Sequence, residues 1–274
     1  MTTIVIGAAS GMGAAVARKL APRGPLVIAD RAEDELAALA AELDDEVRLA
    51  VCDITDQAQI DALFAGIDTV DALVITAGVS GAQAPGRVIL DVNLVGTARV
   101  LRSAQPLLRH GSVGVCIASQ SGYMVPEHPE LFAVLEDPLS PDFFDHLAQF
   151  FDIDIPSLAY QASKRGVHRL VRCSAAAWGA AGARIMSLSP GINDTPMNRS
   201  EEAKNPVMLD MIKASPLGRR GTPAEVANVV DFLTSEAASY MTGSDVLVDG
   251  GMATVLPSTV WAGRLRTPER TESS

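Results

Sequence analysis

Short apolar segments alternate with longer amphipathic segments along most of the chain. The short segments are rich in β-branched residues and have the length of strands, at residues 3–6, 25–29, 47–51, 72–75, 113–118, 183–189 and 245–248. Between them, hydrophobic positions recur at the three- and four-residue spacing of helices. This alternation predicts an α/β fold in which about seven strands form one parallel, doubly wound sheet.

One segment, residues 123–157, departs from this alternation. It is rich in Pro, Phe and acidic residues, contains neither Lys nor Arg, and holds five of the seven Phe residues. Hydrophobic residues recur there at the spacing of one helix face, at Phe143, Phe144, Leu147, Phe150 and Phe151. We therefore expect a helical insertion within a single domain of residues 1–257, followed by a polar tail over residues 258–274.

Composition and charge narrow the range of partners. The 274 residues are 48% hydrophobic, which suits one domain, and the net charge of -11 disfavours nucleic acid or an anionic membrane as a partner. No apolar stretch is long enough to cross a bilayer, and the chain enters its first strand without a signal-like segment, so we expect a cytoplasmic protein. The three Cys and four His residues show no metal-ligand spacing, so no metal is expected. A small molecule is the expected ligand.

A glycine-rich turn follows the first strand. Gly7, Gly11 and Gly13 have the spacing GxxxGxG and lead into a helix that begins near Ala14. Glycine allows a sharp turn and the close approach of a diphosphate, and the N–H groups at a helix start bind anions. Because the spacing differs from GxGxxG, an ordinary tight turn is the alternative.

Acidic residues end the next two strands. Asp30 lies 23 residues after Gly7, where a carboxylate can accept hydrogen bonds from ribose hydroxyls and repel a 2′-phosphate. This favours NAD over NADP, although Arg31 could instead pair with a phosphate. Asp53 could either cap the following turn or bind the adenine amino group.

Tyr160 and Lys164 form a YxxxK motif at the start of a helical segment. A spacing of four places the phenol and the ammonium on the same helix face, where the cation is expected to lower the pKa of Tyr160. A pair of this kind can exchange a proton with a substrate, and a lysine packed beside a structural tyrosine is the alternative.

With these motifs together, the sequence resembles the short-chain dehydrogenase/reductase family over roughly residues 3 to 253. The resemblance implies a Rossmann-type fold and a catalytic set of Asn93, Ser119, Tyr160 and Lys164. The expected cofactor-binding residues are Gly7, Ser10, Gly11, Met12, Gly13, Asp30, Arg31, Asp53, Ile54, Ala77, Gly78, Tyr160, Lys164, Pro190, Gly191, Ile192 and Thr195. The insertion before Tyr160 resembles the bacterial 3α-hydroxysteroid dehydrogenase/carbonyl reductase subgroup.

The resemblance also implies roles. Tyr160 would exchange a proton with the substrate oxygen and Ser119 would hydrogen-bond that oxygen, with Ser121 as the rival serine. Lys164 would hold the nicotinamide ribose, and Asn93 would anchor a water, unless it only packs its helix. Thr76 stands where the family usually has Asn, and 41 residues separate Ser119 from Tyr160, far more than is usual.

The expected activity is the NAD(H)-dependent interconversion of a secondary alcohol and a ketone, such as a hydroxysteroid or another bulky apolar carbonyl compound. The insertion would either line the substrate cleft or form a subunit interface, and residues 193–216 would form a substrate loop. We expect a homodimer or homotetramer. An NAD(H)-binding regulatory protein without turnover, or an epimerase or dehydratase that uses the same tyrosine, are the alternatives.

Overall fold

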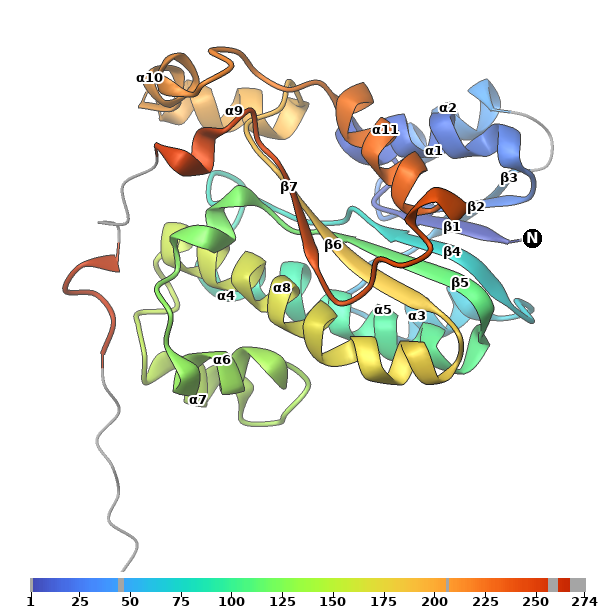
Figure 1. The fold of residues 1–274 in the computed structure, drawn as a ribbon, viewed down its shortest axis with the longest axis horizontal. Helices are drawn as coiled ribbons and strands as arrows, with labels where there is room; N and C mark the ends of the chain where they lie inside the picture. The colour runs from blue at the N-terminus through green and yellow to red at the C-terminus, as the bar shows by residue number, and fades with distance from the viewer. Residues whose placement is uncertain (1, 44–46, 206, 256–260, 267–274) are drawn as a thin grey trace, which may run out of the picture.

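A computed structural model describes residues 2–43, 47–205, 207–255 and 261–266. Its strands form one parallel sheet in the order β3-β2-β1-β4-β5-β6-β7 (Figure 1). The strands are β1 (Thr3–Ile6), β2 (Leu26–Asp30), β3 (Val47–Val51), β4 (Val70–Ile75), β5 (Leu108–Ile117), β6 (Arg184–Pro190) and β7 (Asp245–Val248). The predicted fold class, a single-domain Rossmann-type sheet of seven strands, is confirmed.

Helices cover both faces of the sheet (Figure 1). One face is covered by α1 (Gly11–Leu20), α2 (Glu33–Glu42) and α11 (Pro223–Leu233). The other is covered by α3 (Gln57–Phe64), α4 (Gly86–Leu90), α5 (Thr97–Ala104) and α8 (Pro156–Ala180). Near the carboxyl ends of the strands lie α9 (Pro196–Lys204) and α10 (Val207–Ala214).

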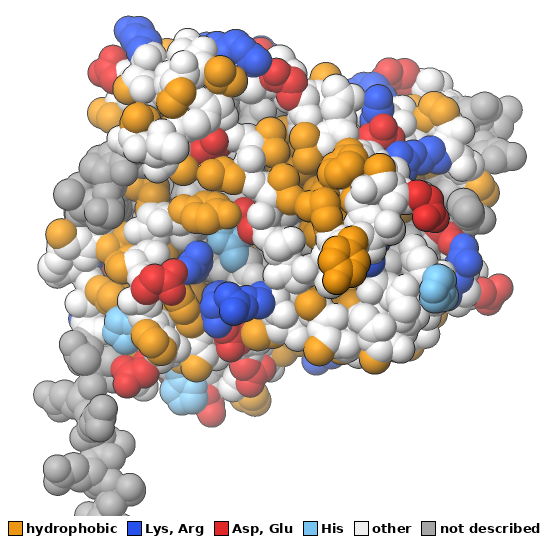
Figure 2. All heavy atoms as spheres, in the orientation of Figure 1, with side chains coloured by type: hydrophobic (Ala, Val, Ile, Leu, Met, Phe, Trp, Pro, Cys, Tyr) orange, Lys and Arg blue, Asp and Glu red, His pale blue; other side chains and the backbone are white. Residues whose placement is uncertain are grey.

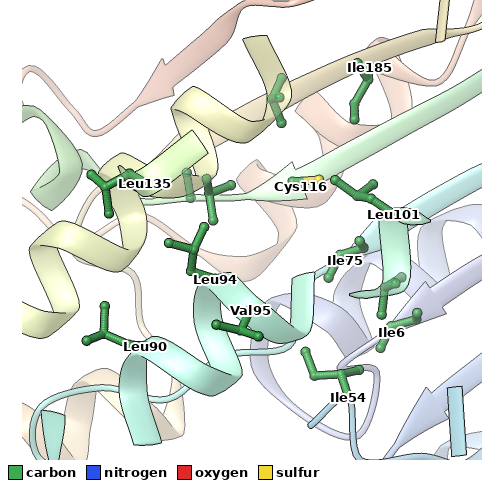
Figure 3. Close-up of a cluster of buried hydrophobic side chains, with 14 of the residues drawn as sticks. Ile6, Ile54, Ile75, Leu90, Leu94, Val95, Leu101, Cys116, Leu135 and Ile185 are labelled. Atoms are coloured by element: carbon green, nitrogen blue, oxygen red, sulfur yellow. The ribbon is translucent and has the colours of Figure 1, made fainter. Parts of the chain in front are cut away.

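Two hydrophobic cores follow from the alternation of side chains along the strands. In β1, Ile4 and Ile6 point to one core, whereas Val5 points to the other. Figure 3 shows part of the larger core, where Leu94 and Leu101 face Ile75 and Cys116 of the sheet. Each large apolar side chain buried in this way contributes roughly 1.5–3 kcal/mol. The sheet therefore holds the strand ends in fixed positions.

The insertion contains two helices, α6 (Pro129–Glu136) and α7 (Phe143–Ala148), that lie beyond α8 in Figure 1. The predicted apolar face does not lie on one continuous helix, because α7 ends at Ala148 and the chain turns there. The predicted apolar side chains are nevertheless buried in the larger core, namely Phe143, Leu147, Phe150 and Phe151. Phe144 is half-buried and stacks against Phe143. These rings therefore pack the insertion onto the domain, and none of them lines the two cavities at the carboxyl ends of the strands.

Most of the predicted polar tail, residues 258–260 and 267–274, lies outside the described residues, and the structure describes only residues 261–266 of it. Trp261 is only 2% exposed. Its Nε1 donates to Gln161 Oε1 at 2.6 Å, and its ring packs edge-on against Phe151. One large aromatic side chain thus fixes a segment whose overall composition is polar.

Among the described residues, none of the helices has the length and apolar character needed to cross a bilayer.

Candidate active site

Two cavities open at the carboxyl ends of the strands. The first, of about 300 Å³, lies over the ends of β1 to β4, where the strand order changes direction between β1 and β4. Nucleotides bind at this position in open α/β sheets. The predicted cofactor residues that line it are Gly7, Ser10, Gly11, Met12, Gly13, Asp30, Arg31, Asp53, Ile54, Ala77, Gly78 and Thr195.

The glycine turn depends on the absence of side chains. Gly7 and Gly11 have φ values of +87° and +54°, in the left-handed region that favours glycine. A Cβ atom on Gly13 would lie 1.9 Å from the Gly7 carbonyl oxygen, so no side chain fits there. The Thr76 hydroxyl lies 2.9 Å from the carbonyl oxygens of both Ile6 and Gly7 and braces the turn from β4. This bracing contact was not predicted from the sequence.

The start of α1 offers free hydrogen-bond donors to the first cavity. Ser10 precedes α1, but its side chain accepts no hydrogen bond from the first turn, which also carries no acidic residue. By contrast, Asp56, Thr195 and Thr222 cap α3, α9 and α11 with their side chains. Uncapped N–H groups at a helix start bind phosphate groups, so this turn fits a dinucleotide cofactor.

Asp30 is held in place at the rim of the first cavity. Its two carboxylate oxygens accept hydrogen bonds from Ala9 N at 3.0 Å and from Ala32 N at 3.1 Å. Each oxygen has a second lone pair that remains available for a ligand. Arg31 is exposed on the same rim. Asp53 caps the following turn, since its Oδ1 accepts from Thr55 N at 2.8 Å, and it also lines the cavity.

The second cavity, of about 600 Å³, brings the proposed proton-exchanging groups together. It is lined by Ser119, directly after β5, and by Tyr160 from the first turns of α8. Ser119 Oγ accepts from Ser121 N at 3.1 Å, so it caps the next turn and also faces the cavity. Ser121, the rival serine, lines the same cavity.

Lys164 lies one turn after Tyr160, with its Nζ 5.9 Å from the centroid of the tyrosine ring. It is 5% exposed and donates to the Ile117 carbonyl oxygen at 3.0 Å. Burial lowers the pKa of Lys164 to about 8, because a charged ammonium is costly to remove from water. The backbone of β5 therefore holds the lysine beside the tyrosine.

The pKa of Tyr160 moves in the opposite direction from the sequence-based expectation. Burial raises the pKa of Tyr160 to about 12; the neighbouring Ser119 hydroxyl opposes this rise, and the Glu201 carboxylate adds to it. Lys164, whose ammonium donates to the Ile117 carbonyl, is not among the groups that shift this pKa. In this state the phenol is protonated at neutral pH.

Asn93 lies in a π-helical segment, Asp91–Gly96, between α4 and α5. Its Oδ1 accepts from Val79 N at 2.8 Å, and its Nδ2 donates to the Val79 carbonyl oxygen at 3.0 Å. Nδ2 also donates to Ser163 Oγ on α8 at 3.2 Å. The Asn93 side chain therefore ties the segment after β4 to the helix that carries Tyr160, which favours the packing role left open by the sequence.

The remaining predicted cofactor residues follow β6. Gly191 and Ile192 line the second cavity, whereas Pro190, the last residue of β6, and Lys164 line neither cavity. The predicted substrate loop at residues 193–216 is largely helical, because Thr195 caps α9 and Pro196 occupies its first turn. Among the described residues, no group of three or more acidic, His or Cys side chains could hold a metal ion.

Several residues of the second cavity were not named as site residues from the sequence, among them Gln120, Met124 and Glu201, although Met124 lies in the predicted insertion and Glu201 in the predicted substrate loop. None belongs to a motif, and each reaches the cavity through tertiary structure. Position alone could have indicated Gln120, since it follows Ser119 directly.

Comparisons with known proteins agree with this geometry. Residues 1–130 match the model of the family described as short chain dehydrogenase, and residues 154–253 match the one described as Enoyl-(Acyl carrier protein) reductase. Cis-4-hydroxycyclohexanecarboxylate dehydrogenase of Sinomonas cyclohexanicum is 34% identical over 92% of this chain and 96% of its own length. The 3-alpha-hydroxysteroid dehydrogenase/carbonyl reductase of Comamonas testosteroni is 30% identical over 94% of this chain and 99% of its own length.

The structures agree as well. The crystal structure of levodione reductase superposes with a TM-score of 0.76 at 27% identity, covering 93% of this chain and 98% of that one. The chain belongs to the short-chain dehydrogenase/reductase family, whose members bind a nicotinamide cofactor, and it is an oxidoreductase of alcohols and ketones. The expected likeness to 3-alpha-hydroxysteroid dehydrogenase/carbonyl reductase is confirmed.

Proposed function

We propose that this protein interconverts a secondary alcohol and a ketone with NAD(H), and that Tyr160 is its acid/base. The observation that carries the proposal is the adjacency of the two cavities, because Tyr160 and Ser119 line one and the uncapped glycine turn lines the other. When bound, the cofactor accepts or supplies the hydride. A substrate oxygen in the second cavity would lie between the Tyr160 and Ser119 hydroxyls.

Each side chain of the set has a distinct role in this proposal. During reduction, Tyr160 donates its phenolic proton to the substrate oxygen, and during oxidation it accepts the proton of the carbinol. Ser119 donates a hydrogen bond to the same oxygen as negative charge develops there. Lys164 stabilises the phenolate and holds the ribose, while Asn93 fixes the segment after β4 against α8.

NAD is the proposed cofactor rather than NADP. Asp30 supports this choice, because its carboxylate is held at the end of β2 by Ala9 and Ala32 and would repel a 2′-phosphate. The expected ribose contact uses the lone pairs that these two N–H groups leave free.

The substrate is proposed to be bulky and largely apolar. Met124, Ile192, Met208 and Met211 line the second cavity, and flexible thioethers adapt to apolar ligands of different shape. The volume of about 600 Å³ suits a ring system. One relative is named for a hydroxysteroid and another for a hydroxycyclohexanecarboxylate, and both names support a hydroxylated ring as the substrate.

A homodimer or homotetramer in the cytoplasm is the proposed state. Figure 2 shows hydrophobic side chains gathered over α11 and β7, where Phe232 and Leu247 are 45% and 39% exposed. Because β7 ends the sheet among the described strands, its open edge can pair with a second copy. All three cysteines are free, which suits a reducing compartment.

Absorbance of NADH tests the proposed activity. Purified protein is mixed with NAD and a panel of cyclic secondary alcohols, and with NADP in a parallel series. We expect NADH formation with at least one alcohol and weaker activity with NADP. A regulatory protein would bind NADH without turnover, and an epimerase or dehydratase would alter the substrate without net NADH formation; either result would contradict the proposal.

A further inference from the structure

The second cavity contains a buried acceptor that has no hydrogen-bond donor among the described residues. Gln120 lines this cavity and is 4% exposed. Its Nε2 donates to the Met252 sulfur at 3.0 Å, whereas its Oε1 is buried with no hydrogen-bond partner in the described part of the chain. A buried carbonyl without a donor destabilises a protein, so its presence beside a cavity calls for an explanation, and a ligand that donates a hydrogen bond supplies one.

The orientation of this amide follows from its neighbour. The thioether of Met252 can accept a hydrogen bond but cannot donate one. Rotating the amide would place the carbonyl oxygen against the sulfur and would lose the contact of Nε2. The group that remains for a ligand is therefore the acceptor.

A second acceptor lines the same cavity on α9. The Glu201 carboxylate faces the cavity and lies near enough to Tyr160 for its charge to raise the pKa of that phenol. Within the described ranges, no hydrogen bond or ion pair of the Glu201 side chain is present. The charged side chains around it are already engaged, since Glu202 pairs with Arg220 and Lys204 Nζ donates to the Ala82 carbonyl oxygen at 2.6 Å.

We propose that Gln120 and Glu201 bind a second hydroxyl group of the substrate, so that the preferred substrate is a cyclic diol with an apolar ring. This inference rests on the proposed dehydrogenase function and concerns the same site. Gln120 follows Ser119 directly and lines the same cavity as the hydroxyl proposed to hold the reacting oxygen. Because Lys204 lines the same cavity as Glu201, charge alone does not decide against an acid of the kind named for the Sinomonas cyclohexanicum relative, and the test includes that acid.

The test compares substrates that differ only in the second group. The kcat/KM for NAD-dependent oxidation is measured with cyclohexanol, with the cyclohexane-1,2-, 1,3- and 1,4-diols, and with cis-4-hydroxycyclohexanecarboxylate. We expect at least one diol to exceed cyclohexanol by about tenfold or more, because a site that hydrogen-bonds a hydroxyl rejects the analogue that lacks it.

Two variants assign the preference to these side chains. Gln120→Met removes the buried acceptor with little change of volume, and Glu201→Leu removes the other acceptor on a half-exposed helix that tolerates substitution. Each is expected to reduce the ratio of diol to cyclohexanol efficiency by about tenfold. Glu202→Gln, one residue along α9, breaks only the pair with Arg220 and should leave the ratio unchanged.

The outcomes separate this inference from the proposed function. Turnover of cyclohexanol without a preference for any diol, or a preference that persists in both Gln120→Met and Glu201→Leu, would overturn the diol inference and leave the dehydrogenase intact. Better turnover of the carboxylate than of every diol would also overturn it. Failure of the wild-type protein to oxidise any of these alcohols with either cofactor would overturn the proposed function together with the inference.

Discussion

The two cavities differ in what surrounds them. The first lies over buried parallel strands and a glycine turn in which an added Cβ at Gly13 would overlap the backbone. The second is bounded by α9, which has no buried side chain, and by α10. The small cluster there contains only Ile192, Met208, Ile212 and Met252 as buried members and is separate from both cores.

This difference assigns different tasks to the two regions. Around the first cavity, backbone geometry determines what fits, and few substitutions are tolerated. Around the second, a few side chains on weakly buried helices determine the shape, so substrate choice can change without disturbing the sheet. Tyr160, Ser119 and Lys164 belong to the region where the rigid sheet meets the adjustable helices.

Removing the ammonium at this boundary should have a large effect on activity. In Lys164→Met, kcat/KM for alcohol oxidation is expected to fall by about 10³-fold or more, because the phenolate loses its stabilising cation. Initial rates of NADH formation provide the measurement. Arg169→Met serves as the control, because Arg169 lies further along α8 and pairs with Glu136 of α6. The activity of this control variant should stay close to that of the wild type. Equal losses in both variants would mean that α8 is disturbed as a whole.

The same lysine should also affect stability as a function of pH. Its folded pKa of about 8 is below the usual 10.5, so the unfolded chain binds more protons between these pH values. The free energy of unfolding of the wild-type protein therefore rises with pH across that window, whereas this contribution is missing in Lys164→Met. The difference between the two proteins is expected to change by up to about 3 kcal/mol. Urea unfolding of both proteins at pH 7 and pH 10 measures the difference. A constant difference between the two proteins would contradict the burial of a charged lysine.

On the cofactor side, Asp30→Ala should relax the choice between cofactors. The ratio of kcat/KM with NAD to that with NADP is expected to fall by about ten- to a hundredfold, because the like-charge repulsion of the 2′-phosphate is lost. Asp34→Asn, on the exposed start of α2, is the matched control. If both variants give the wild-type ratio, Asp30 does not face the ribose.

The smallest effect on activity is expected from a substitution in the second cavity. Met208→Ala should raise KM for bulky alcohols several-fold and lower Tm only slightly, because Met208 packs in the small separate cluster. Leu73→Ala, in the fully buried centre of β4, should instead lower stability by about 2–5 kcal/mol. Calorimetry and substrate kinetics on both variants measure the contrast. Equal Tm losses would show that the two regions are not separable.

The sequence predicted the first region better than the second, for physical reasons. Strands buried on both faces are continuous apolar runs, so all seven were visible, and the turn at Gly7, Gly11 and Gly13 needs residues that stand out in any sequence. The bracing of that turn by Thr76 was missed because it joins residues about 70 positions apart.

The second region depends on contacts that follow no local rule. The roles of Gln120 and Glu201 arise only from the packing of α9 and of the turn after β5. The Phe residues of the insertion satisfied a helix pattern, but the pattern does not say what the face packs against. The same limit explains Trp261, whose burial depends on Gln161 and Phe151 rather than on its polar neighbours.

A comparison of two tyrosines tests the central claim most directly. In Tyr160→Phe, the kcat/KM for NAD-dependent alcohol oxidation is expected to fall by about 10³- to 10⁴-fold, while NADH affinity, measured by fluorescence titration, stays nearly unchanged. Tyr123→Phe should keep near wild-type activity, because that phenol donates to Asp245 away from both cavities. Turnover by Tyr160→Phe at a rate close to that of Tyr123→Phe would contradict the assignment of Tyr160 as the acid/base.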